Sequence, residues 1–363
     1  MNAPLPLLAG QWPATSPDHR VRRGVGLAVI NFNTAAQTLR CLASLERCEE
    51  PPDWILVLDN ASRPEDYGQL LAGCRPLMHS TLRLYRSDSN LGFAAGSNFL
   101  IEQLLAFPTC RFLGMLNNDA VAQPTMVSRL VDALASAPRR IGLSGGRMHK
   151  LHAPEEVDTL GICIYASLMP ADRHSTDDPF LGPTGGCCML ARELVEELLA
   201  TSGYCFDPRY FCYCEDTDLV LRANLLGYEP SYVDEVVALH EGQASSGGGF
   251  NRFIAYHGIR NSIWMQLKLM PSAMLARHGA LLLLAHLVNM GRYVLAGHGR
   301  LLLDVYRDAW NQRQAFLQER PRWVRSGLPG VPTLSARLAP GFYRAGYWRL
   351  AWKQLVRHRR APK

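Results

Sequence analysis

The chain lacks paired cysteines. Its ten cysteines include no Cys-x-x-Cys pair and show no regular spacing, although Cys187 and Cys188 are adjacent. A chain of 363 residues is large enough to bury a core without disulfides. We therefore expect reduced thiols in a cytoplasmic protein. A zinc site remains an open alternative, built from Cys205, Cys212, Cys214 and His240.

The sequence also lacks a secretory leader and, in its last part, acidic residues. Residues 1–18 are rich in proline and contain no basic stretch followed by an apolar one, so export is not predicted. After Glu319 there are 11 Lys and Arg residues and no Asp or Glu, which leaves 27 basic and 32 acidic residues in the first 319 positions. The net charge of +6 therefore belongs to the tail, and the acidic body disfavours nucleic-acid binding.

What the sequence does contain is an alternation of apolar runs and helical periods. Hydrophobic residues make up 48% and charged residues 19% of the chain, which excludes extensive disorder. Strands are predicted at 25–30, 54–58, 82–85 and 112–116, and helices at 34–46, 64–71, 96–107 and after Pro124. This order is typical of an open, mostly parallel α/β sheet with helices on both faces.

Beyond residue 140 the pattern is less regular and finally becomes helical. Two short strands are predicted at 228–233 and 236–240, followed by helices at 253–269, 272–295 and 298–317. Polar residues gather where the first strands end, at Asn31, Asn33, Asp59, Asn60, Asn117 and Asp119. Ligands of such sheets bind beyond the carboxyl ends of the strands, although Asn and Asp also favour ordinary turns.

Three acids open a predicted helix after an aromatic run. Glu215, Asp216 and Asp218 precede the helical period of Leu219, Arg222 and Leu226. Carboxylates at a helix start interact well with its positive end, which is the purely structural interpretation. The same groups could also bind a cation or accept a proton from a substrate.

Two further segments favour phosphate and metal chemistry. The stretch 90–98 joins a strand to a helix through small residues, which lets backbone N–H groups approach a phosphate. It has neither the lysine of a P-loop nor the glycine spacing of a dinucleotide site. Asn117 and Asp119 could hold a divalent cation with a substrate's phosphates, and His240 is a further candidate ligand.

An ordered set of motifs resembles a known family. The set comprises Asn31-Phe-Asn33, Leu58-Asp-Asn-Ala-Ser62, Asn90-Leu-Gly-Phe-Ala-x-Gly-x-Asn98, Leu116-Asn-Asn-Asp119, Phe206-Asp-x-x-Tyr-Phe-x-Tyr-x-Glu-Asp-x-Asp-Leu219 and His240. Together they resemble glycosyltransferase family 2, in its rhamnosyltransferase-like branch with a GT-A fold. The resemblance covers about residues 24–265.

The resemblance implies roles for individual residues. Asp216 would be the catalytic base, in a pair with Glu215. Asp119 would hold Mg²⁺ or Mn²⁺ on the diphosphate, and His240 would join the metal shell. The nucleotide sugar would be bound by Asn31, Asn33, Asp59, Asn60, Asn90, Gly92, Phe93, Asn98, Asn117 and Asn118. Positions around the acceptor, or supporting the site, would be Gly185, Gly186, Asp218, Arg222, Arg260 and Asn261.

Three positions depart from the family pattern. Asn117 replaces an acid of the fuller metal motif, which implies a metal affinity shared with the diphosphate. Asn118 stands where this branch usually has proline, and Cys205 stands where glycine commonly precedes Phe206. The local turn at Cys205 is therefore expected to differ.

The resemblance implies an inverting, metal-dependent glycosyltransferase with a flexible N-terminus at 1–23, a GT-A domain at 24–269 and a helical, basic extension at 270–363. Its partners would be a nucleotide-diphosphate sugar, with rhamnose as the leading sugar, and a saccharide or lipid-linked acceptor of cell-surface polysaccharide synthesis. Two alternatives remain open, a nucleotidyltransferase acting on sugar phosphates and a non-catalytic scaffold. The first would usually carry a basic, Gly-rich start after its first strand, and the second would be expected to have lost Asp119 or Asp216.

The C-terminal part indicates contact with a membrane surface. Residues 279–303 are apolar but interrupted by polar side chains, which favours packed or surface-lying helices over a spanning one. Residues 341–360 have the pattern of a basic amphipathic helix with aromatic residues, suited to an anionic membrane. Docking of that helix on its own domain is the alternative. We therefore expect a cytoplasmic protein, peripheral on the inner face of the plasma membrane.

Overall fold

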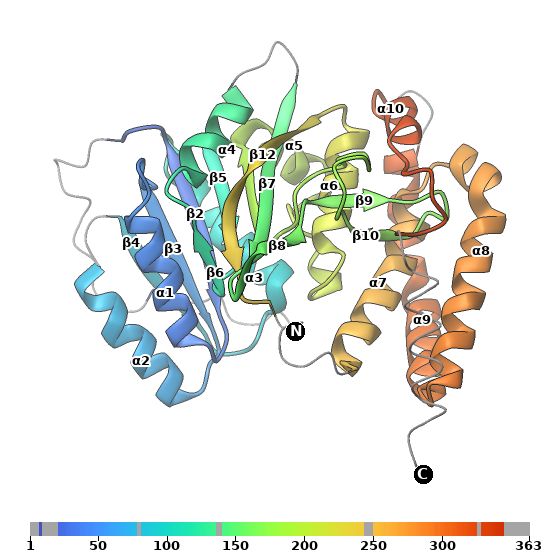
Figure 1. Cartoon of the computed structure of the whole chain (residues 1–363), viewed down its shortest axis with the longest axis horizontal. Helices are drawn as coiled ribbons and strands as arrows, with labels where there is room; N and C mark the ends of the chain where they lie inside the picture. Colours follow the sequence, from blue (N-terminus) through green and yellow to red (C-terminus); the bar gives the residue numbers. More distant parts are fainter. Residues whose placement is uncertain are drawn as a thin grey trace.

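A mixed sheet organises the first two thirds of the chain (Figure 1). The computed structural model describes residues 7–8, 21–77, 81–135, 140–242, 250–324 and 328–344. Within these residues, ten strands form one sheet in the order β1-β4-β3-β2-β5-β11-β7-β12-β6, with β8 paired to β7. The strands are β1 Leu7–Leu8, β2 Val25–Asn31, β3 Trp54–Asn60, β4 Leu82–Ser87, β5 Phe112–Leu116, β6 Ala120–Ala122, β7 Ile141–Lys150, β8 Ala153–Thr159, β11 Cys187–Ala191 and β12 Glu229–His240.

Helices cover both faces of this sheet, as predicted for an α/β protein (Figure 1). They are α1 Ala35–Glu46, α2 Pro64–Cys74, α3 Gly92–Leu105, α4 Met126–Ala135, α5 Arg192–Ser202 and α6 Glu215–Leu225. Short 3₁₀ turns lie at Arg75–Leu77 and Pro208–Tyr210, and a small hairpin pairs β9 Ile162–Ile164 with β10 Pro170–Asp172.

Strands β2 and β3 are almost completely buried. Successive side chains point to opposite faces of the sheet, and each face packs against its own hydrophobic core. Leu27 and Val29 pack with residues of α1, α2 and α4. Ala28 belongs to a second core that contains residues of α3, α5 and α6. The parallel order β4-β3-β2-β5 confirms the four predicted strand–helix units, and it aligns Asn31 beside Asp59 at the ends of β2 and β3.

The second half of the sheet is mixed. Strand β11 runs antiparallel between β5 and β7, whereas β12 is parallel to β7 and antiparallel to β6. The two strands predicted within 228–240 form the single strand β12. A shift of register between Val233 and Val236 marks the place where the sequence pattern broke, since a bulge interrupts the alternation without ending the strand.

Four helices follow the sheet, namely α7 Arg252–Leu269, α8 Ser272–Leu295, α9 Gly299–Val324 and α10 Val331–Ala336. Helix α7 begins at Asn251, whose side chain accepts hydrogen bonds from the N–H groups of Phe253 and Ile254. Trp264 of α7 stacks on Phe316 of α9, and both lie in the same core as α3 and α6. The predicted division at residue 269 stays a prediction, and the helices on its two sides share one core.

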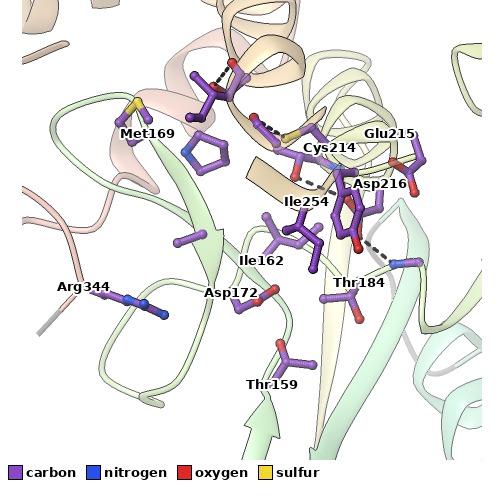
Figure 2. Close-up of a pocket in the computed structure, with 18 of the residues that line it drawn as sticks. Thr159, Ile162, Met169, Asp172, Thr184, Cys214, Glu215, Asp216, Ile254 and Arg344 are labelled. Carbon is purple, nitrogen blue, oxygen red and sulfur yellow. Dashed lines mark hydrogen bonds between the residues drawn. The ribbon is translucent and has the colours of Figure 1, made fainter. Parts of the chain in front are cut away.

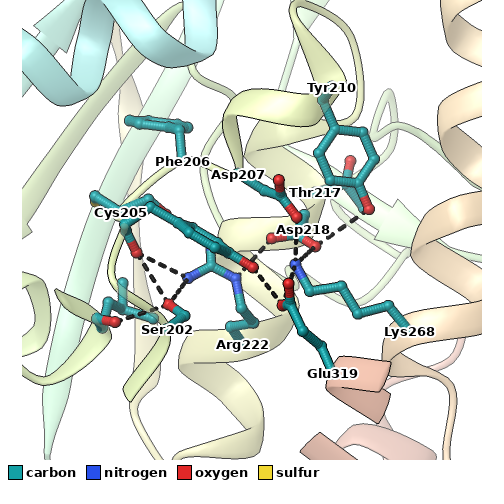
Figure 3. Close-up of polar contacts among 12 residues, drawn as sticks. Ser202, Cys205, Phe206, Asp207, Tyr210, Thr217, Asp218, Arg222, Lys268 and Glu319 are labelled. Carbon is teal, nitrogen blue, oxygen red and sulfur yellow. Dashed lines mark hydrogen bonds and ion pairs between the residues drawn. The ribbon is translucent and has the colours of Figure 1, made fainter. Parts of the chain in front are cut away.

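Buried charges join α6 to the C-terminal helices (Figure 3). Asp218 accepts from Arg222 Nε at 2.6 Å and from Lys268 Nζ at 2.7 Å, and Lys268 also contacts Asp207 at 2.8 Å. All four side chains are fully buried. Removing one partner of such a group leaves an unpaired charge inside the protein, at a cost of about 3–5 kcal/mol. The cluster therefore fixes the start of α6 against α7.

Helix α8 is the least buried of the long helices. In the described part of the chain it is the one helix long and apolar enough to cross a bilayer by length and composition, and only 11% of its most apolar window is buried. It forms one edge of the molecule, outside α9 (Figure 1). The basic amphipathic helix predicted over 341–360 lies mostly outside the described residues.

Candidate active site

A cavity of about 680 Å³ lies between the second half of the sheet and the helices α7 and α8 (Figure 2). Its wall includes the loop 184–186 before β11, the first turn of α6, and His240 at the end of β12. Helices α7 and α8 close it on the other side, through residues such as Ile254 and Asn289. The cavity therefore collects side chains that lie far apart in the sequence.

Asp216 is held in this wall by backbone donors. Gly185 N donates to its Oδ2 at 3.0 Å, and Thr217 N donates to its Oδ1 at 2.7 Å. Burial raises the pKa of the Asp216 carboxyl, and these backbone hydrogen bonds oppose the rise because they favour the charged form. Asp216 is thus a fixed, half-buried acceptor that reaches the cavity, as Figure 2 shows.

Glu215 also borders the cavity, but in a different state. Among the described residues its Oε2 is buried and has no hydrogen-bond partner. Burial, and then the neighbouring charge of Asp216, raise the pKa of Glu215 well above its usual value. The two neighbouring carboxyls therefore lie in different environments, which favours different roles for Glu215 and Asp216.

The loop before α6 is strained. Phe211, Tyr213 and Cys214 all have positive φ angles of 66°, 67° and 66°, although none is glycine. At Phe211 the turn is closed by Cys212 N donating to the oxygen of Tyr210 at 2.8 Å. Such backbone costs about 1–3 kcal/mol for each residue and persists only where its surroundings hold it.

Asn261 supplies that support. Its Nδ2 lies 3.0, 2.9 and 2.7 Å from the carbonyl oxygens of Tyr210, Cys212 and Tyr213. Arg260 in turn donates from Nε to Asn261 Oδ1 at 3.0 Å and lies over the ring of Trp264. The Arg260–Asn261 pair therefore lies outside the cavity and positions the loop that leads into Glu215 and Asp216.

His240 lies between two carboxylates. Its Nε2 is 3.1 Å from Asp119 Oδ1, and its Nδ1 is 2.8 Å from Asp158 Oδ2. Burial opposes protonation of the ring, but hydrogen bonds to Asp119 and Asp158 outweigh burial and raise the pKa of His240 to about 10. The Asn117 amide lies 3.3 Å from the same Nε2. Asp119, Asn117 and His240 are therefore brought together, as the sequence predicts.

A short path of contacts connects this histidine to Asp216. Gly186 lies so close to Asn117 that a Cβ there would be 3.2 Å from its Nδ2. A Cβ on Gly185 would lie 3.1 Å from the ring of Phe93. Because residues 185 and 186 have no side chains, this segment of the cavity wall fits between the Asn117–His240 pair and Asp216. Both Asp216 and His240 border the same cavity.

Of the predicted nucleotide residues, Phe93 and Asn117 line the cavity, and most of the others form a network at the ends of β2 and β3, outside its lining. Asn31 Nδ2 lies 2.9 Å from Asp59 Oδ1 and 2.9 Å from Asp66 Oδ2, and Thr38 donates to Asn31 Oδ1 at 2.7 Å. Asn118 donates to Thr38 Oγ1 at 2.8 Å. Asn33 joins this edge through its Oδ1, which accepts from Arg63 N at 2.9 Å.

The Gly-rich turn is attached to the same edge. Asn60 Nδ2 donates to Asn90 Oδ1 at 3.0 Å, and Asn90 Oδ1 accepts from Gly92 N at 2.8 Å. Gly92 has a φ of +73°, and a Cβ there would lie 2.5 Å from the ring of Phe211. A side chain at position 92 would therefore push away the strained loop.

Three predicted site residues belong to the framework instead. Asn98 uses both ends of its amide on the backbone of Phe206, at 2.6 and 2.8 Å, and does not line the cavity. Asp218 and Arg222 are fully buried and paired with each other. Their predicted places beside nucleotide or acceptor are corrected, because their polar groups are already consumed inside the protein.

Sequence reasoning missed Asp158 and the contribution of α8. Asp158 lies in β8 shortly after Glu155 and Glu156, and nothing in the sequence distinguishes it from them. Only the pairing of β7 with β8 brings it to His240. The alternative zinc site gains no support, since no group of three or more His, Cys, Asp or Glu in the described residues could hold a metal.

Comparisons with known proteins agree with this geometry. The model of glycosyl transferase family 2 matches residues 27–199. The N-acetylglucosaminyl-diphospho-decaprenol L-rhamnosyltransferase of Mycobacterium tuberculosis is 24% identical over 259 residues, which cover 64% of this chain and 80% of that protein. The match supports the predicted resemblance to rhamnosyltransferases.

Solved structures share the fold. A mannosyltransferase from Pyrobaculum calidifontis, in complex with GDP-Man and Mn²⁺, superposes with a TM-score of 0.50 at 15% identity, covering 96% of this chain and 89% of that one. S. aureus TarS 1–349, in complex with UDP-GlcNAc, gives a TM-score of 0.50 at 14% identity, covering 86% and 87%. The fold is that of GT-A glycosyltransferases. Residues 27–199 thus match the model of glycosyl transferase family 2, and the chain resembles a rhamnosyltransferase of that kind.

Replacing Asn261 by Ala tests its part in holding the loop. The substitution leaves three carbonyls, one buried and two partly buried, without their shared donor, and we expect a loss of about 2 kcal/mol in the free energy of unfolding. Amides of residues 211–214 should exchange with deuterium faster, as measured by mass spectrometry. Asn311→Ala, at an exposed position of α9, is the control and should change neither quantity. Unchanged exchange at 211–214 in the Asn261 variant would contradict the role.

Proposed function

We propose that the protein is an inverting glycosyltransferase that moves a sugar from a nucleotide-diphosphate donor to a hydroxyl of a saccharide or lipid-linked acceptor. Rhamnose is the leading candidate for the sugar, because the curated relative is named as a rhamnosyltransferase. The observation that carries the proposal is a single cavity bordered by a backbone-held Asp216 and by His240 with its partner Asp119.

The donor would lie across the ends of β2, β3 and β5. The network around Asn31 and Asp59 is suited to a nucleoside, since it presents fixed amide and carboxylate groups at one edge of the sheet. The Asn90–Gly92 turn opens α3, where backbone N–H groups favour phosphate. With the nucleoside at Asn31 and Asp59 and the phosphates at the start of α3, the sugar would lie in the cavity beside Asp216. The solved relatives with GDP-Man and UDP-GlcNAc support donors of this class.

The residues around His240 fit a divalent cation. Asp119 and Asn117 face its Nε2, while Asp158 holds its Nδ1, an arrangement that orients a histidine for metal binding. The protein would supply only two strong metal ligands, Asp119 and His240. This small number suits Mg²⁺ or Mn²⁺, whose coordination would be completed by oxygens of the diphosphate. When bound, such a cation would stabilise the negative charge of the leaving diphosphate. The Mn²⁺ in the mannosyltransferase complex supports this assignment.

Asp216 would act as the base. An acceptor hydroxyl attacks more readily when a carboxylate within hydrogen-bond reach accepts its proton. Asp216 has its charged form stabilised by two backbone N–H groups, whereas Oε2 of Glu215 has no hydrogen-bond partner among the described residues. One base and one displacement would invert the anomeric centre. Glu215 would border the same cavity without accepting the proton.

The acceptor would enter from the side of α7 and α8. The relative's name describes a diphospho-decaprenol acceptor, and a lipid-linked acceptor places the reaction at a membrane. We therefore propose a role in cell-surface polysaccharide synthesis at the cytoplasmic face of the plasma membrane. Nucleic acid is not among the proposed partners.

Asp216→Asn and Glu215→Gln form a matched pair that tests the base. Asp216→Asn keeps size and loses basicity, so we expect turnover to fall by about 10³-fold while the affinity for nucleotide sugar changes little. Glu215→Gln should retain most of the activity, because the proposal gives Glu215 no part in accepting the proton. Transfer is followed by nucleotide release, and donor affinity by calorimetry. Near-normal turnover by Asp216→Asn would remove it from the role.

Asp119→Ala and His240→Ala test the metal site through binding rather than activity. UDP, TDP and GDP, each with Mn²⁺, should raise the melting temperature of the wild-type protein for at least one nucleotide. Both variants should lose the part of this rise that depends on Mn²⁺. Asp158→Asn should weaken Mn²⁺ binding by about 10–100-fold, because it orients His240.

Glu156→Gln serves as the control for Asp158, since it lies two residues away on the same strand and is exposed. It should bind Mn²⁺ as the wild type does. An unchanged Mn²⁺-dependent rise in the Asp119 and His240 variants would exclude both as ligands.

A further inference from the structure

Helix α8 carries an exposed apolar stripe along one side. The stripe comprises Leu283, Leu284, Leu287, Met290, Val294 and Leu295. Leu283 is 62%, Leu287 53% and Leu295 63% exposed, far more than leucines usually are in a folded protein. These positions recur at helical spacing, so they form one continuous surface rather than scattered contacts.

The opposite side of α8 belongs to the cavity wall. Ala285, Asn289, Arg292 and Tyr293 recur at the same helical spacing and border the cavity. His286 contacts Tyr306 of α9 at 3.0 Å and Gln266 of α7 at 3.3 Å. A helix with one side packed on protein in this way cannot be surrounded by lipid. It is suited to lie along a membrane surface, with the apolar stripe facing the acyl region.

The charge of α8 fits an anionic surface. The helix contains no Asp or Glu, and its two fully charged side chains are Arg277 and Arg292. The chain that follows Glu319 adds 11 Lys and Arg residues without a single acid. Each basic residue near an anionic surface adds to the attraction, which helps to hold a helix in the headgroup region.

We propose that α8 is the membrane-binding element of the protein, lying in the headgroup layer of an anionic bilayer with its apolar stripe inserted. The cavity then lies on the other side of α8 from the lipid, about one helix diameter from it. A lipid-linked acceptor would place its polar head in the cavity, past Asn289 and Arg292, while its chain stays in the bilayer along the stripe. The statement about the acceptor rests on the proposed function; the statement about the membrane does not.

Vesicle binding without any sugar nucleotide tests the membrane contact separately. Flotation with phosphatidylcholine vesicles, and with vesicles that also contain phosphatidylglycerol, should recover the wild-type protein, more of it on the anionic vesicles. The double variant Leu283→Glu/Leu287→Glu should lower the bound fraction by about tenfold or more, since it removes two inserted leucines. The bound fraction should also fall on the uncharged phosphatidylcholine vesicles. This result would assign the loss of binding to missing apolar contact rather than to repulsion between the new glutamates and anionic lipid.

The double variant Gln69→Glu/Ala72→Glu is the matched control. It adds the same charge to exposed positions of α2, at the opposite end of the molecule (Figure 1). Binding by this control should stay within about twofold of the wild type, because α2 faces away from the proposed surface. Thermal unfolding should be similar for all three proteins, since the changed side chains are exposed.

Two results would overturn the proposal. One is equal flotation of the wild type and the α8 variant. The other is a wild-type dimer in solution that the α8 variant converts to a monomer, with no vesicle binding by either, which would assign the stripe to a second copy of the chain. Retained donor binding by the α8 variant shows that its failure on vesicles is separate from any failure of the transferase proposal.

Discussion

Three carboxylates in the first turn of α6 are the constraint around which the rest of the structure is arranged. Like charges so close cannot all remain ionised without partners. Asp218 is neutralised by Arg222 and Lys268 inside the protein. Asp216 accepts hydrogen bonds from two backbone N–H groups, and Glu215 is buried with its Oε2 unpaired among the described residues. Asp216 is thereby the acid that backbone donors hold in place at the cavity.

The pairing of these carboxylates also determines how the C-terminal helices pack against α6. Lys268 belongs to α7, so the pairing of Asp218 ties the start of α6 to the helices that follow the sheet. Asn261 of the same helix holds the strained loop before Glu215. The catalytic turn and the C-terminal helices therefore form one packing unit. The same unit sets α8 beside the cavity, with one side lining it and another exposed.

Local patterns predicted the parallel half of the sheet and the polar groups at its edge, because both follow from residues close in sequence. Asn31 and Asp59 meet as the parallel register requires. The antiparallel place of β11 and the approach of Asp158 to His240 depend on pairing between distant segments, which no local period encodes. The Asp218–Arg222 pair was visible as an i,i+4 ion pair, and its burial could not be foreseen from spacing alone.

The central claim is that Asp119 and His240 hold the cation of the donor while Asp216 stays free to act as a base. Anomalous scattering from a crystal grown with Mn²⁺ and a nucleoside diphosphate tests this claim most directly. The account predicts one Mn²⁺ bound by Asp119 and His240, in contact with the diphosphate, with Asp216 across the cavity and not coordinated. A Mn²⁺ ion coordinated instead by Glu215 or Asp216 would contradict it.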